Sequence, residues 1–394
     1  MLTIFVPLIL VYTYVARRLY QSLTNPGGNP VLIKRWLVAS ILYCNLLPVL
    51  FLATFLLWGR PGTVAFTGEV RLVDYLLSYP FWIALVITVQ LFLVIVCWDI
   101  AKLVFLPLYR KHKTKWLSYQ NKFVRYAAFL VAVYSIVVTI SNTWTIQVRT
   151  ETIPLPERAA ELDGLRIVQI GDVQGDGRTT RDKLESLVAK VNSLEPELIL
   201  FAGDLVTSGE RYIESTASVL GKLRPRIAAI AAIGDHDIFS NKAKVKESLL
   251  KNGMIVLEDS TIDIPVRGET ISITGVTYTY RKRPSLDTLE QVSNGRNGKY
   301  RILLAHQPAN SLVDYASSRS YNLFVAGHTH GGGIAFGIPG LLLIAPASFE
   351  TRYLSGLYNE DGMYVSVNNG IGFTLAPIRY HAPAEITLLV LKKK

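Results

Sequence analysis

The chain has 394 residues, enough for two or three domains, and half of them are hydrophobic, with a mean hydropathy of +0.30 that is high for a purely soluble protein. The net charge of +11 is concentrated in residues 1–143, which hold 13 of the 41 Lys and Arg and 3 of the 30 Asp and Glu, leaving 28 basic and 27 acidic residues for the rest. The remainder therefore shows no basic footprint for nucleic acid, and because Cys44 and Cys97 both lie in the first region, it has neither a disulfide nor a cysteine zinc site.

Four apolar stretches fill the N-terminal region, and we expect each to form a helix that crosses a membrane. A span takes about 20 apolar residues, and basic side chains at the ends of a shorter stretch can reach the membrane surface. The first stretch is short enough for a signal peptide, but it lacks a basic leading segment and a small-residue cleavage site, and Arg17 and Arg18 follow it. We therefore expect a retained helix. The stretches cover residues 2–16, 36–58, 75–109 and 123–141.

The loops between these stretches differ in charge. The first and third are strongly basic, whereas the second is neutral. Because basic loops stay in the cytoplasm, we expect an integral protein of the inner or cell membrane whose chain after about Asn142 is extracytoplasmic, in the periplasm or a lumen. The alternative is a cytoplasmic domain with one span fewer, the first being miscounted. The basic loop residues are Arg17, Arg18, Lys34, Arg35, Arg110, Lys111, Lys113, Lys115, Lys122 and Arg125.

The pattern changes after the last apolar stretch. We expect residues 1–143 to form the transmembrane region, residues 144–162 a polar, proline-containing linker, and residues 163–394 a domain of alternating strands and helices, which is an α/β pattern. Helical periodicity appears at 179–194, 212–223 and 242–250, Arg267-Gly268 predicts a hairpin turn, and the charged stretch 282–299 predicts an exposed loop.

Five predicted strands of this domain end in carboxylate or imidazole residues. Asp172 and Asp204 are 32 residues apart, and Asp204 and Asp235 are 31 apart, which is about one strand–helix–strand unit each. In open α/β sheets the chemistry collects just past the carboxyl ends of the strands. The pattern therefore predicts a metal site. The strand ends are Asp172, Asp204, Asp235-His236-Asp237, His306 and His328-Thr329-His330.

These strand ends resemble the five ordered motifs of the calcineurin-like metallophosphoesterases, in particular the membrane-anchored bacterial branch. The motifs are Gly171-Asp172-Val173-Gln174, Gly203-Asp204, Gly234-Asp235-His236-Asp237, Ala305-His306 and Gly327-His328-Thr329-His330-Gly331-Gly332. The resemblance covers about residues 163–394. It implies a four-layer α/β/β/α sandwich, preceded here by about four transmembrane helices.

The resemblance also implies a role for each residue. Two divalent metal ions would be bound, one by Asp172, Gln174, Asp204 and His330, and the other by Asp204, Asp235, His306 and His328. Asp204 would bridge the two ions. His236 would not bind metal but would act in catalysis, by giving a proton to the leaving oxygen or stabilising the phosphoryl charge.

Two positions depart from the family pattern. Gln174 stands where the family has histidine, and Asp235 stands where it usually has asparagine. An amide oxygen and an added carboxylate favour Mn²⁺, Fe²⁺ or Mg²⁺ over Zn²⁺ at these positions. Asp176 is a second candidate ligand near Gln174, although a carboxylate in Gly175-Asp176-Gly177 is typical of a turn.

The expected function is that of a membrane-anchored, metal-dependent phosphohydrolase that cleaves phosphate ester or pyrophosphate bonds. Its expected partners are the lipid bilayer and a phosphorylated substrate, which a domain at the membrane surface could take from lipid-linked phosphates or nucleotide-sugar lipids. The alternative is a catalytically degenerate membrane sensor or scaffold, which Gln174 favours and His236 disfavours. A transporter is disfavoured because the apolar stretches carry almost no charge. The sequence leaves the substrate and the oligomeric state open.

Overall fold

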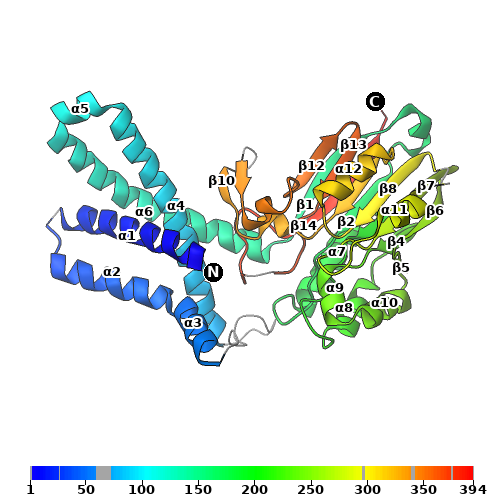
Figure 1. Cartoon of the computed structure of the whole chain (residues 1–394), viewed down its shortest axis with the longest axis horizontal. Coiled ribbons are helices and arrows are strands. Elements are labelled where there is room, and N and C mark those ends of the chain that lie inside the picture. Colours follow the sequence, from blue (N-terminus) through cyan, green and yellow to red (C-terminus); the bar gives the residue numbers. More distant parts are fainter. Residues whose placement is uncertain are drawn as a thin grey trace. The chain divides into compact units, whose positions relative to one another are not determined.

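The computed structural model describes residues 2–25, 27–58, 72–294, 298–338, 342–373 and 376–393 (Figure 1). The chain divides into two compact units, a helical N-terminal unit that extends to Ile140 and a C-terminal unit that runs from Ser141 to the end of the chain. Each is described by itself below. How residues 1–143, 144–162 and 163–394 divide as domains stays a prediction.

The N-terminal unit is helical. Among its described residues, Asp74–Val104 and Lys113–Trp144 are long and apolar enough to cross a membrane, and the bent pair Pro30–Cys44 and Leu46–Leu57 would make a third span if it acts as one. The expected count of four stays a prediction. The helices are α1 (Leu2–Thr24), α2 (Pro30–Cys44), α3 (Leu46–Trp58), η2 (Asp74–Ser78), α4 (Tyr79–Val104), α5 (Leu106–Lys111) and α6 (Lys113–Trp144).

Helices α1 and α4 are joined by a polar contact in apolar surroundings. Arg18 on α1 forms an ion pair with Asp99 on α4, and the Tyr14 hydroxyl donates a hydrogen bond to the same carboxylate. Buried Val15 and Ile95 pack in the same cluster. A charge in a membrane segment needs such a partner, because an isolated carboxylate in hydrocarbon is strongly unfavourable.

The first sheet of the C-terminal unit has six strands in the order β1-β14-β2-β3-β4-β5. Strands β2, β3, β4 and β5 are parallel, β14 is antiparallel to β2, and β1 is parallel to β14. The strands are β1 (Gln147–Pro154), β2 (Arg166–Ile170), β3 (Leu198–Phe201), β4 (Ala228–Ala231), β5 (Ile255–Val256) and β14 (Glu385–Lys392). The expectation of a linker is therefore wrong for Gln147–Pro154. These residues pair along their whole length with the C-terminal strand, a partner more than 200 positions away that local composition does not reveal.

The second sheet also has six strands, in the order β12-β13-β9-β8-β7-β6. Its central strands β13, β9, β8 and β7 are parallel, and β6 and β7 form the predicted hairpin, with Arg267 and Gly268 both at positive φ as a two-residue turn requires. The strands are β6 (Ser260–Val266), β7 (Glu269–Val276), β8 (Tyr300–Ala305), β9 (Leu323–Ala326), β12 (Gly356–Glu360) and β13 (Met363–Val367); β10 (Phe336–Ile338) and β11 (Leu342–Ile344) form a separate antiparallel pair.

Alternating side chains stack these sheets into four layers. In β2, Ile167 faces a core shared by the two sheets, and Val168 faces the helices outside the first sheet. In β8, Leu304 faces the shared core and Leu303 faces the helices outside the second sheet. The expected α/β/β/α sandwich is confirmed. The helices are α7 (Arg181–Ser193), α8 (Ile213–Leu220), α9 (Asp235–Ser240), α10 (Lys242–Lys251), α11 (Leu286–Ser293) and α12 (Asn310–Ser318), with short 3₁₀ turns η3 (Glu157–Leu162), η4 (His330–Gly332) and η5 (Pro346–Phe349).

The expectation of an exposed loop over residues 282–299 is wrong in part, because α11 lies within it. Ser285 caps this helix by accepting a hydrogen bond from the backbone N–H of Thr288, and Leu289 and Val292 are buried. Two apolar positions in a charged stretch are a weak signal, and it is the packing against the second sheet that makes the helix favourable. Residues 295–297 of this stretch lie outside the described residues.

Candidate metal centre

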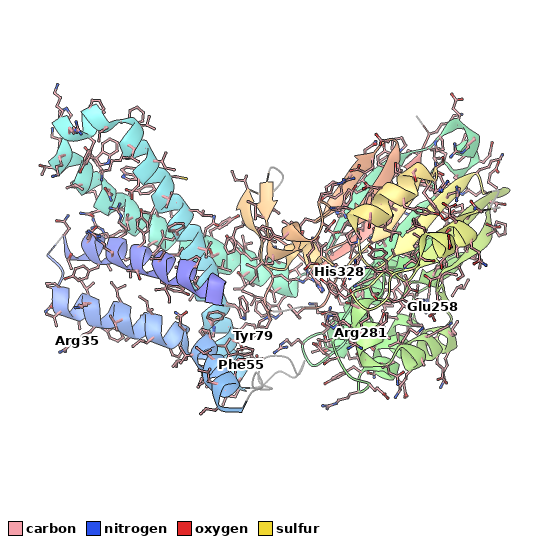
Figure 2. All side chains as sticks on the ribbon, in the orientation of Figure 1. Arg35, Phe55, Tyr79, Glu258, Arg281 and His328 are labelled. Atoms are coloured by element: carbon pink, nitrogen blue, oxygen red, sulfur yellow. The ribbon has the colours of Figure 1, made fainter. Side chains whose placement is uncertain are left out.

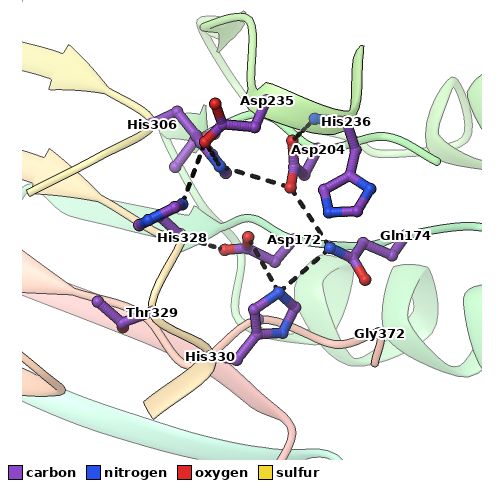
Figure 3. Close-up of polar contacts among 12 residues, drawn as sticks. Asp172, Gln174, Asp204, Asp235, His236, His306, His328, Thr329, His330 and Gly372 are labelled. Atoms are coloured by element: carbon purple, nitrogen blue, oxygen red, sulfur yellow. Dashed lines mark hydrogen bonds and ion pairs between the residues drawn. The ribbon is translucent and has the colours of Figure 1, made fainter. Parts of the chain in front are cut away.

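The two sheets bring their strand ends to one place. Asp172, Asp204 and Asp235 follow β2, β3 and β4 of the first sheet, and His306 and His328 follow β8 and β9 of the second. Because the strands within each set are parallel, their carboxyl ends lie along one edge. Figure 2 labels His328, which follows β9, and Figure 3 shows that the carboxylates and imidazoles converge.

The backbone at the strand ends has a strained conformation at three of the site residues. Asp172, Asp204 and His328 have φ values of 45°, 61° and 73°, in a region that residues other than glycine seldom adopt. Such conformations cost of order 1 kcal/mol or more each and concentrate at functional sites. The backbone at Gly234 passes close to Asp204. A Cβ on Gly234 would lie 2.2 Å from Asp204 Oδ1, so this position admits only glycine.

Asp204, Asp235, His306 and His328 form the first cluster, here called the paired-histidine cluster. His306 Nε2 lies 3.4 Å from Asp204 Oδ2 and 3.4 Å from Asp235 Oδ2, and His328 Nδ1 lies 3.2 Å from Asp235 Oδ2. Donor atoms about 2.0–2.1 Å from a tetrahedral ion are about 3.4 Å apart, so this spacing suits a metal ion. His306 Nε2 is buried and has no hydrogen-bond partner among the described residues, which an ion would supply.

Charges within the paired-histidine cluster stabilise one another. Burial favours a raised pKa for Asp235, but the hydrogen bond from His328 and the charge of His306 outweigh it and lower this pKa to about 2. Burial likewise favours a lower pKa for His328, but Asp235 and Glu350 raise it to about 10. An ion that binds His328 must displace this proton, so binding releases a proton.

Asp172, Gln174 and His330 form the second cluster, here called the glutamine cluster, on the other side of Asp204. His330 Nε2 lies 3.5 Å from Asp172 Oδ1 and 3.2 Å from Gln174 Nε2, and the same amide nitrogen lies 3.3 Å from Asp204 Oδ2. Asp172 Oδ1 and Gln174 Oε1 are buried and lack hydrogen-bond partners among the described residues. Burial, together with the charge of Asp204, raises the pKa of Asp172 to about 6.

Asp204 lies between the clusters. Its Oδ1 accepts a hydrogen bond from the backbone N–H of His236 at 2.8 Å, and its Oδ2 faces both His306 and Gln174. One oxygen is thus held by the backbone, and the other is shared by the two clusters (Figure 3). This geometry is compatible with the expected bridging role, which stays a prediction.

His236 lies beside Asp204 at the start of α9 and is half-buried. Its Nδ1 is hydrogen-bonded to the backbone carbonyl of Thr207. A carbonyl only accepts, so Nδ1 carries the proton and Nε2 is the nitrogen that can exchange a proton with a bound molecule. Its ring does not enter either cluster (Figure 3), in keeping with a catalytic rather than a metal-binding role.

Asp176 is a turn residue in this structure. Its Oδ1 accepts hydrogen bonds from the backbone N–H groups of Arg178 and Thr179, both at 2.7 Å, and its Oδ2 accepts one from the Thr207 hydroxyl at 2.8 Å. These bonds use both oxygens to shape the loop after Gln174. The alternative that Asp176 replaces Gln174 as a ligand is not supported by this geometry.

Several residues beside the ligands were not assigned roles from the sequence. Gln307 donates to Asp235 Oδ2 at 2.7 Å, the backbone N–H of Tyr280 donates to Asp235 Oδ1 at 2.7 Å, and Glu350 Oε2 lies 3.3 Å from His328 Nε2. Adjacency to His306 was the only sequence signal for Gln307. Tyr280 and Glu350 come from connecting segments, and their sequence surroundings carry no motif.

A cavity of about 350 Å³ opens beside His328. The Tyr280 hydroxyl donates to Glu350 at 2.6 Å across one side of it, and Arg283 supplies a positive charge. Next to it, Arg281 lies over the ring of Phe239, with its guanidinium carbon 4.7 Å from the ring centre (Arg281 is marked in Figure 2). The lining residues are Tyr280, Arg283, Gln307, Pro308, Ala309, His328, Glu350 and Thr351.

Part of the C-terminal unit matches a known protein family. Residues 165–332 match the family model of the calcineurin-like phosphoesterases. The chain is 30% identical over 237 residues to the uncharacterized metallophosphoesterase YkuE of Bacillus subtilis, which covers 58% of this chain and 80% of that protein. It is 27% identical to the uncharacterized metallophosphoesterase Cj0846 of Campylobacter jejuni, over 78% of this chain and 79% of that protein.

The name of a third relative includes a transmembrane region. The transmembrane protein with metallophosphoesterase domain of Danio rerio is 28% identical over 274 residues, which cover 67% of this chain and 61% of that protein. The chain belongs to the calcineurin-like phosphoesterases, metal-dependent enzymes that hydrolyse phosphoester bonds. The family expected from the sequence is confirmed, whereas the individual roles of the site residues stay predictions.

Proposed function

We propose that this protein is a membrane-anchored phosphohydrolase that acts on amphiphilic phosphate esters or pyrophosphates, of which lipid-linked phosphates and nucleotide-sugar lipids are examples. The observation that carries the hydrolase part is the convergence of Asp204, Asp235, His306 and His328, with His236 beside them. The choice of an amphiphilic substrate rests on exposed apolar side chains of β10, β11 and η5, of which Phe349 directly precedes the cavity-lining residue Glu350.

The residues of the two clusters would bind metal ions, and His236 would transfer a proton. The paired-histidine cluster would hold one divalent ion, and the glutamine cluster together with Asp204 would hold the other. When bound, such ions neutralise the phosphoryl oxygens and activate a water molecule. His236, with Nδ1 fixed by the Thr207 carbonyl, would carry a proton on Nε2 and release it to the leaving oxygen. The amide oxygen of Gln174 favours Mn²⁺, Fe²⁺ or Mg²⁺ over Zn²⁺ at the second of these positions.

Exposed apolar side chains on β10, β11 and η5 support an amphiphilic substrate. Ile338 on β10, Ile344 on β11 and Phe349 on η5 are 62%, 52% and 89% exposed. Phe349 directly precedes Glu350, which lines the cavity and contacts His328. Large exposed apolar groups of this kind suit contact with the acyl or prenyl tail of a substrate. Here Ile338, Ile344 and Phe349 are called the apolar rim.

Chain connectivity and loop charge support the proposed membrane location. Helix α6 ends at Trp144 and β1 begins at Gln147, so a short connection tethers the catalytic domain to a membrane helix. The basic first and third loops favour an inner or cell membrane with an extracytoplasmic catalytic domain. A phosphatase reporter fused after Lys394 in a bacterial host should be active. An inactive reporter, together with an active cytoplasmic reporter at the same point, would contradict this orientation.

The test of the substrate class compares two phosphorylated substrates. Full-length protein would be assayed with a lipid phosphate in vesicles and with a water-soluble phosphate ester. Phe349→Ser and Ile344→Ser should slow hydrolysis of the vesicle substrate and leave the soluble ester unaffected, and Leu250→Ser, a half-exposed apolar residue on α10, should change neither. Equal effects on both substrates would contradict a lipid-linked substrate.

The second candidate function is a membrane sensor or scaffold that binds metal or ligand without turnover. Gln174 favours it, because the amide replaces the family's histidine. The intact His236 disfavours it. If metal-loaded protein hydrolysed nothing in a panel of phosphomonoesters, diesters, pyrophosphates and extracted lipids, this function would replace the hydrolase.

A further inference from the structure

The three clustered histidines differ in what contacts the ring nitrogen that faces away from the site. His306 Nδ1 lies 2.8 Å from the carbonyl oxygen of Ala202, and His328 Nε2 lies 3.3 Å from Glu350 Oε2. Both partners accept hydrogen bonds. His330 Nδ1 instead lies 3.2 Å from Arg379 Nη2, a group that only donates.

This difference sets which nitrogen can bind a metal ion. A neutral imidazole has one N–H and one lone pair. When the outer nitrogen donates to a carbonyl or carboxylate, the inner nitrogen presents its lone pair to an ion, as in His306 and His328. When the outer nitrogen accepts from a guanidinium, the inner nitrogen carries the proton. His330 then presents an N–H, rather than a lone pair, to the site.

Arg379 is fixed in this position. It is only 1% exposed, and its guanidinium donates to the carbonyl oxygen of Gly372 through Nε at 3.0 Å and Nη2 at 2.7 Å, and to that of Ala382 through Nη1 at 3.0 Å. Two backbone segments therefore hold the group against His330. Its positive charge also disfavours a cation on the other side of the ring.

The N–H of His330 has acceptors within the glutamine cluster. Asp172 Oδ1, at 3.5 Å, is one of the buried atoms without a hydrogen-bond partner among the described residues. The terminal amide of Gln174, at 3.2 Å, supplies another when its oxygen faces the ring, and a half-turn of an amide exchanges oxygen and nitrogen without moving other atoms. In that orientation the oxygens of Asp172, Gln174 and Asp204 face one another. A cation among them would relieve their repulsion.

We propose that the metal centre has two chemically unequal positions and that Arg379 creates the inequality. The position at Asp204, Asp235, His306 and His328 binds a transition metal ion tightly. The position at Asp172, Gln174 and Asp204 has oxygen ligands only, with His330 as a hydrogen-bond donor that positions Gln174 and not as a ligand. It selects a hard ion, Mg²⁺ or Mn²⁺, and holds it weakly. This proposal rests on the metal centre of the proposed function.

Zinc titration of the full-length protein tests the inequality without any assay of activity. Wild-type protein should bind one Zn²⁺ ion per chain tightly by calorimetry, and mass spectrometry should find one ion after desalting. His328→Ala should lose this ion, and His330→Ala should keep it. Glu350→Gln should weaken it by about 10–100-fold, the usual effect of removing the partner of a metal-bound histidine. Thermal unfolding would establish that each variant is folded.

Manganese binding separates a positioning role of His330 from a merely structural one. His330→Gln keeps an N–H near the position of Nε2 and should retain a second, weaker Mn²⁺ ion by electron paramagnetic resonance, whereas His330→Ala should lose it. Gln174→His combined with Arg379→Met should create a second tight Zn²⁺ position. If the double variant does not fold, the comparison of His330→Ala with His328→Ala still decides.

Two results would overturn the proposal. One is two equally tight Zn²⁺ ions in wild-type protein with one lost in His330→Ala, and the other is no tight Zn²⁺ ion at all. Turnover is a separate outcome. A protein that binds metal as described and hydrolyses nothing would leave the unequal centre standing and reject the proposed hydrolase.

Discussion

The carboxylate of Asp237 holds the backbone of Asp204. Asp237 Oδ2 accepts hydrogen bonds from the backbone N–H groups of Asp204 and Gly234, both at 2.9 Å, and Oδ1 accepts one from Leu205 at 2.8 Å. Burial, with the charge of Asp204, raises the pKa of Asp237 to about 6. A completely buried acid thus links two strand ends and keeps Asp204 at its positive φ of 61°.

Asp237→Asn should destabilise the protein by about 1–3 kcal/mol. The amide turns one acceptor oxygen into a donor, so at least one buried backbone N–H group loses its partner. Activity should fall as well, because Asp204 is no longer held in place. Thermal unfolding and activity would both be measured, with Asp182→Asn on the surface of α7 as the matched control, which should change neither. Unaltered stability of Asp237→Asn would show that the hydrogen bonds from these backbone N–H groups to Asp237 do not stabilise the fold.

His236→Ala should leave metal content nearly unchanged and slow the chemical step by roughly 10²–10⁴-fold, the usual range for a general acid. The reason is that the backbone N–H of His236 donates to Asp204, while its ring nitrogen Nδ1 is hydrogen-bonded to the Thr207 carbonyl and not to either cluster. Metal content by mass spectrometry and single-turnover rates would be compared. Loss of metal together with activity would assign His236 to the ligands instead.

Lys183 should make stability depend on pH. Burial and the nearby charge of Arg379 lower its pKa in the folded protein from 10.5 to about 7, although its ammonium group donates to the carbonyls of Thr143 and Ile371. Between these pH values the unfolded chain holds a proton that the folded chain lacks, so the free energy of unfolding rises with pH.

The measurement is chemical unfolding in detergent from pH 7 to 9. Wild-type protein should gain roughly 1 kcal/mol per pH unit relative to Lys183→Met, which cannot titrate. Lys190→Met, on the same helix, should keep the wild-type slope. Parallel slopes for wild-type protein and Lys183→Met would show that Lys183 titrates normally.

The layers of the fold were predictable where the signal is local. The apolar stretch that contains β4 is followed by a glycine and an acid, Gly234 and Asp235, and helices such as α7 show a clear apolar face, so the alternation could be seen in the sequence. Strand β1 could not, because its partner β14 lies at the other end of the chain. Helix α11 was missed because it has only two buried apolar residues, and their role becomes clear only from the sheet on which they pack.

The residues of the metal centre were predictable for similar reasons. The proposed chemical difference between its two metal positions was not. Each proposed ligand follows a strand within one to four residues, so motif and position coincide. The contacts behind the histidines come from segments distant in the chain: Glu350 behind His328 and Arg379 behind His330. Whether a histidine presents a lone pair or a proton depends on such partners, which only the three-dimensional structure reveals.

The most direct test of the account is metal-dependent hydrolysis together with Asp204→Ala. Asp204 Oδ2 faces both clusters, so its loss should remove turnover and most bound metal at once. Wild-type protein stripped with EDTA should hydrolyse no phosphate ester, regain activity with Mn²⁺, and lose it again in Asp204→Ala. Hydrolysis that persists in EDTA, or an Asp204→Ala variant that keeps both its metal and its activity, would contradict a metal-dependent phosphohydrolase centred on Asp204.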